Sequence, residues 1–229
     1  MNRNVLKIIA AVTMTFDHIG VIMLEPDSLE YYIFRSIGRI AFVLFAYMIA
    51  EGFFKTKNLK SYFLRLFVYA SIIEAFIIGY YFISGENYIL GFNVIWPLVF
   101  GLGALLLLKN KSIWIRLISI LVVFAAELLH IPYGGYGVLI IMVFGLYRNP
   151  LTQLLFVLGI NLLFIDVPLL SYLDLASYAK YIWIQWFSMV AFAFILFYNG
   201  KKGKFRMKWF FYIFYPLHLG IIYLINYLL

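Results

Sequence analysis

Long apolar runs separated by short polar connections follow one another along the whole chain. A helix needs about 20 predominantly apolar residues to cross the hydrocarbon core of a bilayer. The pattern predicts nine membrane-spanning helices, over residues 5–24, 31–54, 61–84, 92–108, 113–130, 133–147, 151–170, 180–199 and 209–229. The sixth is short and glycine-rich at its start, so eight or nine full crossings fit the pattern. We expect an all-α polytopic membrane protein with one integral-membrane domain over residues 1–229.

Composition excludes the other broad classes of protein. Apolar residues make up 66% of the chain and charged residues 12%, whereas soluble domains have about 45–50% apolar and about 25% charged residues. A disordered chain needs low hydrophobicity and high charge, the reverse of this composition. The absence of cysteine excludes disulfides, a thiolate nucleophile and an iron–sulfur cluster.

The distribution of basic residues predicts how the chain lies in the membrane. If the N-terminus is cytoplasmic, fifteen of the eighteen lysines and arginines fall in cytoplasmic segments. The outer segments carry only Lys180, and Arg35 and Arg39 lie within the second span. Because cytoplasmic loops carry the excess of basic residues, we expect a multi-pass protein of a bacterial-type inner or plasma membrane. Its N-terminus is expected to be cytoplasmic and its C-terminus external. The same rule explains the net charge of +8 without a nucleic-acid partner.

Five ionisable residues from four spans fall near the middle of the predicted membrane. They are Asp17, His18, Arg39, Glu74 and His218. Ionisable groups at that depth are costly and are candidates for function by default. A buried charge also needs a partner, and either Asp17 or Glu74 can serve Arg39.

Two neighbouring features refine this group. Arg35 is four residues before Arg39, so the two guanidinium groups share a helix face. Pro216 lies two residues before His218 and cannot donate to the carbonyl of Tyr212. We therefore expect a locally opened helix that aims the His218 imidazole.

These residue types suit two kinds of chemistry. Histidine beside a carboxylate is a general-base arrangement, and a buried guanidinium group can stabilise a developing oxyanion. The set therefore suits acyl transfer to a hydroxyl or an amine. The same residue types form proton relays in transporters. The chain contains no phosphate-binding loop and no metalloprotease or serine-hydrolase motif, and we expect no metal.

Sequence blocks spread over nearly the whole chain resemble the TraX family. The two most specific blocks are Asp17–Gly20 (DHIG) and Tyr215–Leu219 (YPLHL). The other matching blocks are Leu6–Ala10, Met14–Phe16, Ile37–Phe42, Phe45–Ala46, Glu51–Phe53, Tyr62–Leu66, Glu74, Phe92–Val94, Tyr133–Leu139, Tyr198–Lys201 and Phe211–Phe214. In one place the chain departs from the family pattern. Pro132 stands where the family usually carries an aspartate. Either Glu127 or His130 replaces that aspartate, or the acceptor differs from the family's.

The resemblance implies a membrane acetyltransferase of the kind associated with N-terminal acetylation of a conjugative pilin. Acetyl-CoA would be the cytoplasmic donor, and a pilin, peptide or glycan outside the cytoplasm would be the acceptor. Asp17 would orient His18, either His18 or His218 would deprotonate the acceptor, and Arg39 would stabilise the oxyanion. Supporting roles are expected for Glu74, Glu51, Arg35 and Asn93. The phosphates of coenzyme A would meet Lys55, Lys57, Lys60 and Arg65, or Lys201 and Lys202.

Two other classes of function remain open at this point. A small proton-coupled transporter or lipid flippase would use the same polar residues, although the chain shows no inverted repeat. A non-catalytic membrane assembly factor is the third class. Turnover of labelled acetyl-CoA separates the enzyme from both alternatives.

Overall fold

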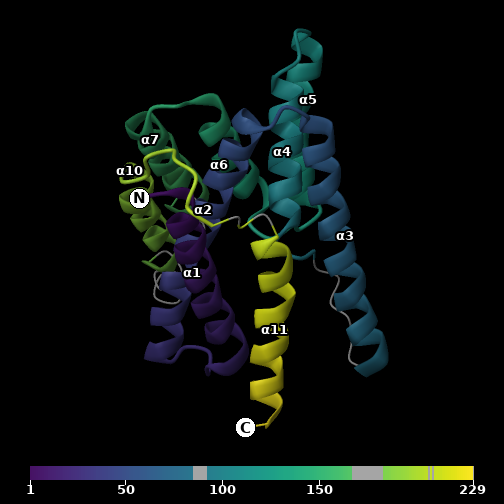
Figure 1. Ribbon diagram of the computed structural model, residues 1–229, viewed down its shortest axis with the longest axis vertical. Coiled ribbons are helices and arrows are strands. Elements are labelled where there is room, and N and C mark those ends of the chain that lie inside the picture. The colour runs from purple at the N-terminus through teal and green to yellow at the C-terminus, as the bar shows by residue number, and fades with distance from the viewer. Residues whose placement is uncertain (85–91, 167–182, 206, 208, 229) are drawn as a thin grey trace. The chain divides into compact units, whose positions relative to one another are not determined.

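The computed structural model describes residues 1–84, 92–166, 183–205, 207 and 209–228, and its regular structure within these ranges is helical (Figure 1). Four of the helices in these ranges are long and apolar enough to cross a membrane. They are α1 (Arg3–Met23), α2 (Leu29–Lys55), α3 (Leu59–Ser84) and α11 (Phe210–Leu228). The predicted helical character is thereby confirmed, and these apolar helices agree with the predicted multi-pass character.

The remaining apolar segments form shorter helices. They are α4 (Trp96–Leu108), α5 (Ile113–Leu128), α6 (Gly134–Leu146), α7 (Pro150–Asn161) with a π-helical turn at Leu162–Asp166, and α10 (Ala191–Leu196) after a 3₁₀ turn at Phe187–Val190. Helix α4 has 13 residues. It therefore spans about 20 Å, less than the hydrocarbon core of about 30 Å. Nine full-length crossings are more than the described helices provide. The end of the seventh predicted span, the start of the eighth and Lys180 lie outside the described residues.

The chain divides into two compact units. The first unit contains Met1–Phe45 and Asn149–Leu229, and the second contains Ala46–Arg148. Helix α2 contributes its first part to one unit and its last part to the other. The prediction of a single domain over residues 1–229 stays a prediction.

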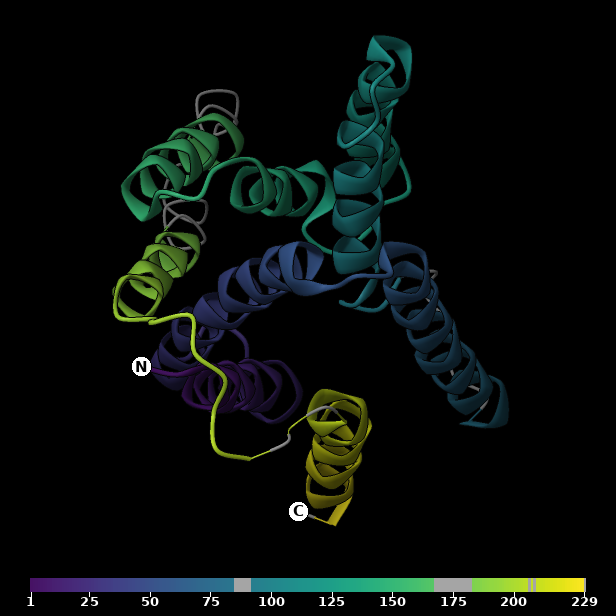
Figure 2. The ribbon, with the colours of Figure 1, turned by 45° about the horizontal axis from the view of Figure 1, so that its top comes forward.

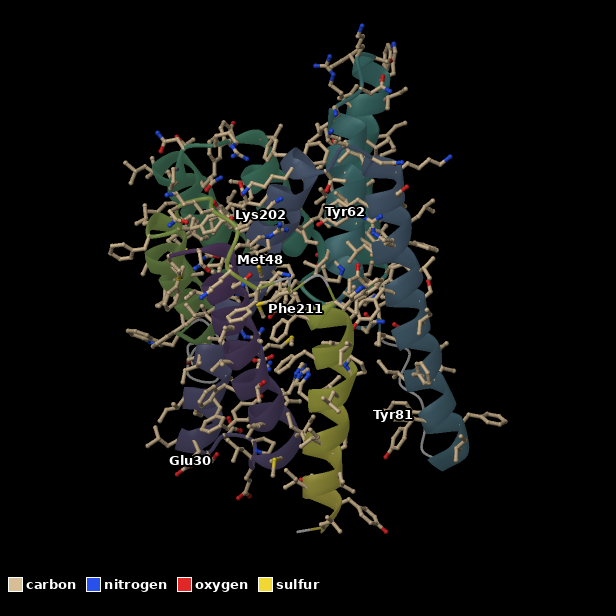
Figure 3. The ribbon with its side chains drawn as sticks, viewed as in Figure 1. Glu30, Met48, Tyr62, Tyr81, Lys202 and Phe211 are labelled. Atoms are coloured by element: carbon tan, nitrogen blue, oxygen red, sulfur yellow. The ribbon has the colours of Figure 1, made fainter. Side chains whose placement is uncertain are left out.

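In the first unit, α1 packs beside α11, although they lie at opposite ends of the sequence (Figure 2). Phe211, labelled at the start of α11 in Figure 3, joins them, because the Lys7 Nζ lies 5.4 Å from its ring centroid. The segment before α11 runs along the first turn of α1. There the Arg3 N–H donates to the Lys201 carbonyl (3.0 Å) and the Asn199 N–H donates to the Met1 carbonyl (2.9 Å).

In the second unit, α4, α5 and α6 pack together and α3 packs against α4. Gly101 permits the close approach of α4 and α6, because a Cβ atom at this position would overlap the Ile141 side chain. Glu127 accepts a hydrogen bond from the Gly135 N–H (2.8 Å). This carboxylate satisfies a backbone donor in the first turn of α6, where the helix dipole also favours negative charge.

Glu74 joins α3 to the start of α4. Its Oε2 accepts from the Asn93 backbone N–H (2.8 Å), the Asn93 Nδ2 (2.8 Å) and the Trp96 Nε1 (3.1 Å). The Asn93 Nδ2 also donates to the Ala70 carbonyl at 2.9 Å. The expected supporting residues Glu74 and Asn93 are thus hydrogen-bonded to each other within the second unit. Three N–H donors on one carboxylate indicate a structural role for Glu74.

We predict that Glu74→Ala lowers the free energy of unfolding by about 3 kcal/mol, because it leaves three donors without this acceptor. Thermal unfolding of the purified protein in detergent, followed by circular dichroism, measures the loss. The matched control is Glu25→Ala, which removes an exposed carboxylate and should change stability by less than about 0.5 kcal/mol. Equal melting temperatures for the two variants would contradict the structural role.

Candidate functional site

Helices α1 and α11 bring two histidines into direct contact. The Nδ1 of His18 lies 2.7 Å from the Nε2 of His218, across 200 residues of sequence. The two ring centroids are 4.9 Å apart. His218 is buried and His18 is half-buried, so the contact lies inside the first unit. Two of the candidate residues from distant spans therefore meet, as their common depth predicts.

The backbone and aromatic rings of α11 hold the His218 imidazole. Its Nδ1 lies 2.8 Å from the Phe214 carbonyl oxygen, and its ring stacks on the Phe214 ring at a centroid distance of 4.9 Å. The Tyr215 ring packs against both imidazoles, 6.0 Å from His18 and 5.7 Å from His218. Helix α11 continues through Pro216 instead of opening there. The Phe214 carbonyl, rather than an opened turn, therefore orients the ring.

Asp17 binds two arginines of α2. Its Oδ1 lies 2.7 Å from the Arg35 Nη1 and 3.2 Å from the Arg39 Nη2. The predicted pair of Asp17 and Arg39 is present, and Arg35 is the nearer partner. The side chains of Asp17, Arg35 and Arg39 are 19%, 19% and 13% exposed, so solvent screens these ion pairs weakly.

The structure corrects the predicted pairing of Asp17 with His18. Successive residues of an α-helix point about 100° apart around its axis, since 3.6 residues make a turn. Asp17 accordingly faces α2, and His18 faces α11. The group against the Nδ1 of His18 is His218, and Asp17 instead holds the two guanidinium groups.

Gly38 makes room for the Asp17 carboxylate. A Cβ atom at Gly38 would overlap the Oδ1, Cγ and Cβ atoms of Asp17. Gly38 lies between the two arginines on α2, so only a residue without a side chain lets the carboxylate reach both of them. Sequence reasoning did not identify this role, although the spacing Arg35-Ser-Ile-Gly-Arg39 carried the signal.

The Asp17 cluster carries a surplus of positive charge. One carboxylate faces two guanidinium groups, which leaves a net charge of about +1 on these three side chains at neutral pH. A developing oxyanion is stabilised by fixed donors and positive charge in a site that excludes water. The cluster belongs to the same unit as the two histidines. Among the described residues no three histidine or carboxylate side chains gather as a metal site requires.

Glu51 forms ion pairs with two basic side chains in the second unit. It is 7% exposed and pairs with Lys55 and with the Arg148 Nη1 (3.1 Å). The Arg148 guanidinium lies 4.3 Å from the centroid of the Phe54 ring. Sequence reasoning gave Arg148 no role, because 97 residues separate it from Glu51 and no spacing rule links the two.

The basic residues expected to meet coenzyme A lie on the surface. Lys55, Lys57, Lys60, Arg65, Lys201 and Lys202 are all exposed. Lys201 and Lys202 belong to the first unit, as the histidines do, and the other four belong to the second. Figure 3 shows Lys202 near the start of α1 and Glu30 near its other end. The basic and acidic connections of this unit are thus separated along the direction of α1.

Comparisons with known proteins identify relatives along nearly the whole chain. The family model described as TraX protein matches residues 2–226. A protein from Dichelobacter nodosus named "Probable fimbrial assembly protein FimC, serogroup H1" is 27% identical over 245 residues, which cover 97% of this chain and 97% of that protein. No solved structure matches the chain.

We predict that Gly38→Ala lowers the free energy of unfolding by about 1–3 kcal/mol, because the added methyl group displaces the Asp17 carboxylate. The matched control is Gly220→Ala in α11, where a Cβ atom meets nothing within 4 Å. This control should be neutral or stabilising by up to about 1 kcal/mol, since alanine favours the helix. Thermal unfolding in detergent compares the variants. If both variants lost the same free energy of unfolding, displacement of the Asp17 carboxylate would not explain the effect of Gly38→Ala.

Proposed function

The chain belongs to the TraX family, and we propose that it is a membrane acyltransferase that carries an acetyl group from cytoplasmic acetyl-CoA to an extracytoplasmic acceptor. The acceptor atom is an amine nitrogen or a hydroxyl oxygen. The observation that carries the proposal is the direct contact of His18 with His218 in the unit that also holds the cluster of Asp17, Arg35 and Arg39. A base and a positively charged oxyanion site are the two parts that acyl transfer requires.

The proposed step uses only these side chains. An imidazole nitrogen takes the proton from the acceptor as the acceptor atom attacks the carbonyl carbon of the thioester. The carbonyl oxygen becomes an oxyanion, which the Arg39 guanidinium stabilises. The carbon–sulfur bond then breaks, and the imidazolium returns its proton to the thiolate, so free coenzyme A leaves. Asp17 holds Arg35 and Arg39 in place during both stages.

The basic segment before α11 is the preferred place for the phosphates of coenzyme A. Lys201 and Lys202 belong to this segment, which is hydrogen-bonded to the first turn of α1 at Arg3. His18 lies fifteen residues further along α1, or about 22 Å at 1.5 Å per residue. The extended pantetheine arm would carry the thioester over that depth. Lys55, Lys57, Lys60 and Arg65 are the alternative set, in the second unit.

The relative's name supports an acceptor related to pili. The D. nodosus protein is named as a fimbrial assembly protein, and N-terminal acetylation of a pilin subunit would be one such assembly step. We therefore propose a pilin amine as the acceptor, with other peptides and glycans as alternatives. If the protein is instead a proton-coupled transporter or a non-catalytic assembly factor, it has the same fold and does not turn over acetyl-CoA.

We predict that His18→Ala lowers the rate of acetyl loss from acetyl-CoA by about 10²–10⁴-fold, the usual contribution of a general base. Purified protein with labelled acetyl-CoA measures the rate, with water or a pilin N-terminal peptide as the acceptor. Glu25→Ala is the control, because it removes an exposed ionisable side chain of the first unit that has no part in the proposed step. No turnover by the unsubstituted protein with either acceptor would exclude the enzyme. Full turnover by His18→Ala would exclude the assigned role of His18.

We also propose a cytoplasmic N-terminus and an external C-terminus, on the strength of the charge distribution. In intact cells, an impermeant maleimide should label the cysteine of Glu25→Cys and leave that of Lys57→Cys unlabelled. The chain contains no cysteine of its own to interfere. Both positions are exposed in the structure, so burial does not explain a difference. Labelling of Lys57→Cys alone would reverse the proposed orientation.

A further inference from the structure

A chain of two hydrogen bonds runs from the backbone of α11 to His18. The Phe214 carbonyl oxygen lies 2.8 Å from the Nδ1 of His218, and the Nε2 of His218 lies 2.7 Å from the Nδ1 of His18. A carbonyl oxygen only accepts hydrogen bonds. The Nδ1 of His218 must therefore carry a proton in order to donate to Phe214.

That proton determines the protonation of the other three ring nitrogens. A neutral imidazole has one donor nitrogen and one acceptor nitrogen, so the Nε2 of neutral His218 is an acceptor. The Nδ1 of His18 must then donate to it, since two acceptors at 2.7 Å would repel each other. The Nε2 of neutral His18 consequently keeps its lone pair and has no proton.

We infer that the Nε2 of His18 is the general base and that His218 is a positioning residue, which fixes the tautomer of His18. The inference rests on the proposed acyl transfer and names the atom that performs it. When the Nε2 of His18 takes the acceptor proton, its Nδ1–H still donates to His218. The hydrogen bond to neutral His218 therefore stabilises the His18 imidazolium. The proton then returns from the Nε2 of His18 to the thiolate of coenzyme A.

The surroundings of His218 fit a positioning role. Its side chain is buried, with a relative exposure of 6%. Its ring lies nearly parallel to that of Phe214, with 11° between the two planes. The Nε2 is bound to His18 and the Nδ1 is bound to Phe214, so both nitrogens are occupied within the protein. Neither ring nitrogen of His218 is therefore open to a substrate proton, whereas the Nε2 of His18 has no hydrogen-bond partner among the described residues.

The first test observes the tautomers directly and needs no turnover. The chain contains 3 histidines, so solid-state NMR of ¹⁵N-histidine-labelled protein in lipid gives three pairs of ring signals. The variants His130→Gln and His218→Gln each remove one pair of signals, so together they assign the signals of all three histidines. We expect a protonated Nδ1 and an unprotonated Nε2 in both His18 and His218 at neutral pH. A protonated Nε2 on neutral His18 would overturn the inference, whether or not the protein transfers acetyl groups.

The second test separates positioning from packing. In His218→Gln the amide oxygen still accepts from the Nδ1–H of His18, whereas His218→Phe keeps a ring on Phe214 and removes the acceptor. We expect His218→Phe to lower kcat by up to about 10⁴-fold, because loss of the correct histidine tautomer has an effect of that size in the Ser-His-Asp triad. The KM for acetyl-CoA should stay unchanged, and His218→Gln should retain most of kcat. Equal kcat values in the two variants, with equal melting temperatures, would overturn the positioning role. Absence of turnover in the unsubstituted protein would instead overturn the acyl transfer itself and leave the NMR result to decide the tautomers.

Discussion

The Asp17 carboxylate shared by Arg35 and Arg39 is the interaction on which the candidate site depends. A charged side chain in an apolar environment is destabilising unless an opposite charge pairs with it. This requirement sets the rotation of α1 about its own axis, because Asp17 has to face α2 at Gly38. Once Asp17 faces α2, the next residue turns by about 100°, and His18 points toward α11. The ion pairs of Asp17 thus fix the direction of the His18 imidazole, although they make no contact with it.

The sequence predicted those properties that follow from hydrophobicity and charge alone. The predicted second span, 31–54, matches Leu29–Lys55, and the predicted sixth, 133–147, matches Gly134–Leu146. Ionisable residues inside apolar runs must find partners. Depth therefore limited the partner of Arg39 to Asp17 or Glu74, and the structure shows that it is Asp17. The depth estimate also put His18 and His218 at one level, and the structure brings them into contact.

The neighbour that each helix face meets was beyond prediction, because the apolar periodicity of a helix indicates which face is buried and not which other helix covers it. Adjacency in sequence suggested that Asp17 orients His18, and only the three-dimensional packing shows that they face different helices. Glu74 is satisfied by Asn93 and Trp96, a pairing that depends on the turn before α4. The contact of Glu51 with Arg148 likewise joins residues that no spacing rule connects.

The contact between α1 and α11 has a consequence for the order in which the protein matures. A ribosome makes α1 before α11, and the helix that supplies His218 emerges about 200 residues later. Chain segments made first can fold first, but Met1 and Arg3 gain their backbone partners at Asn199 and Lys201 only when the connection before α11 has been made. The histidine pair consequently forms only after α11 has been inserted, so a nascent chain without α11 has no complete candidate site.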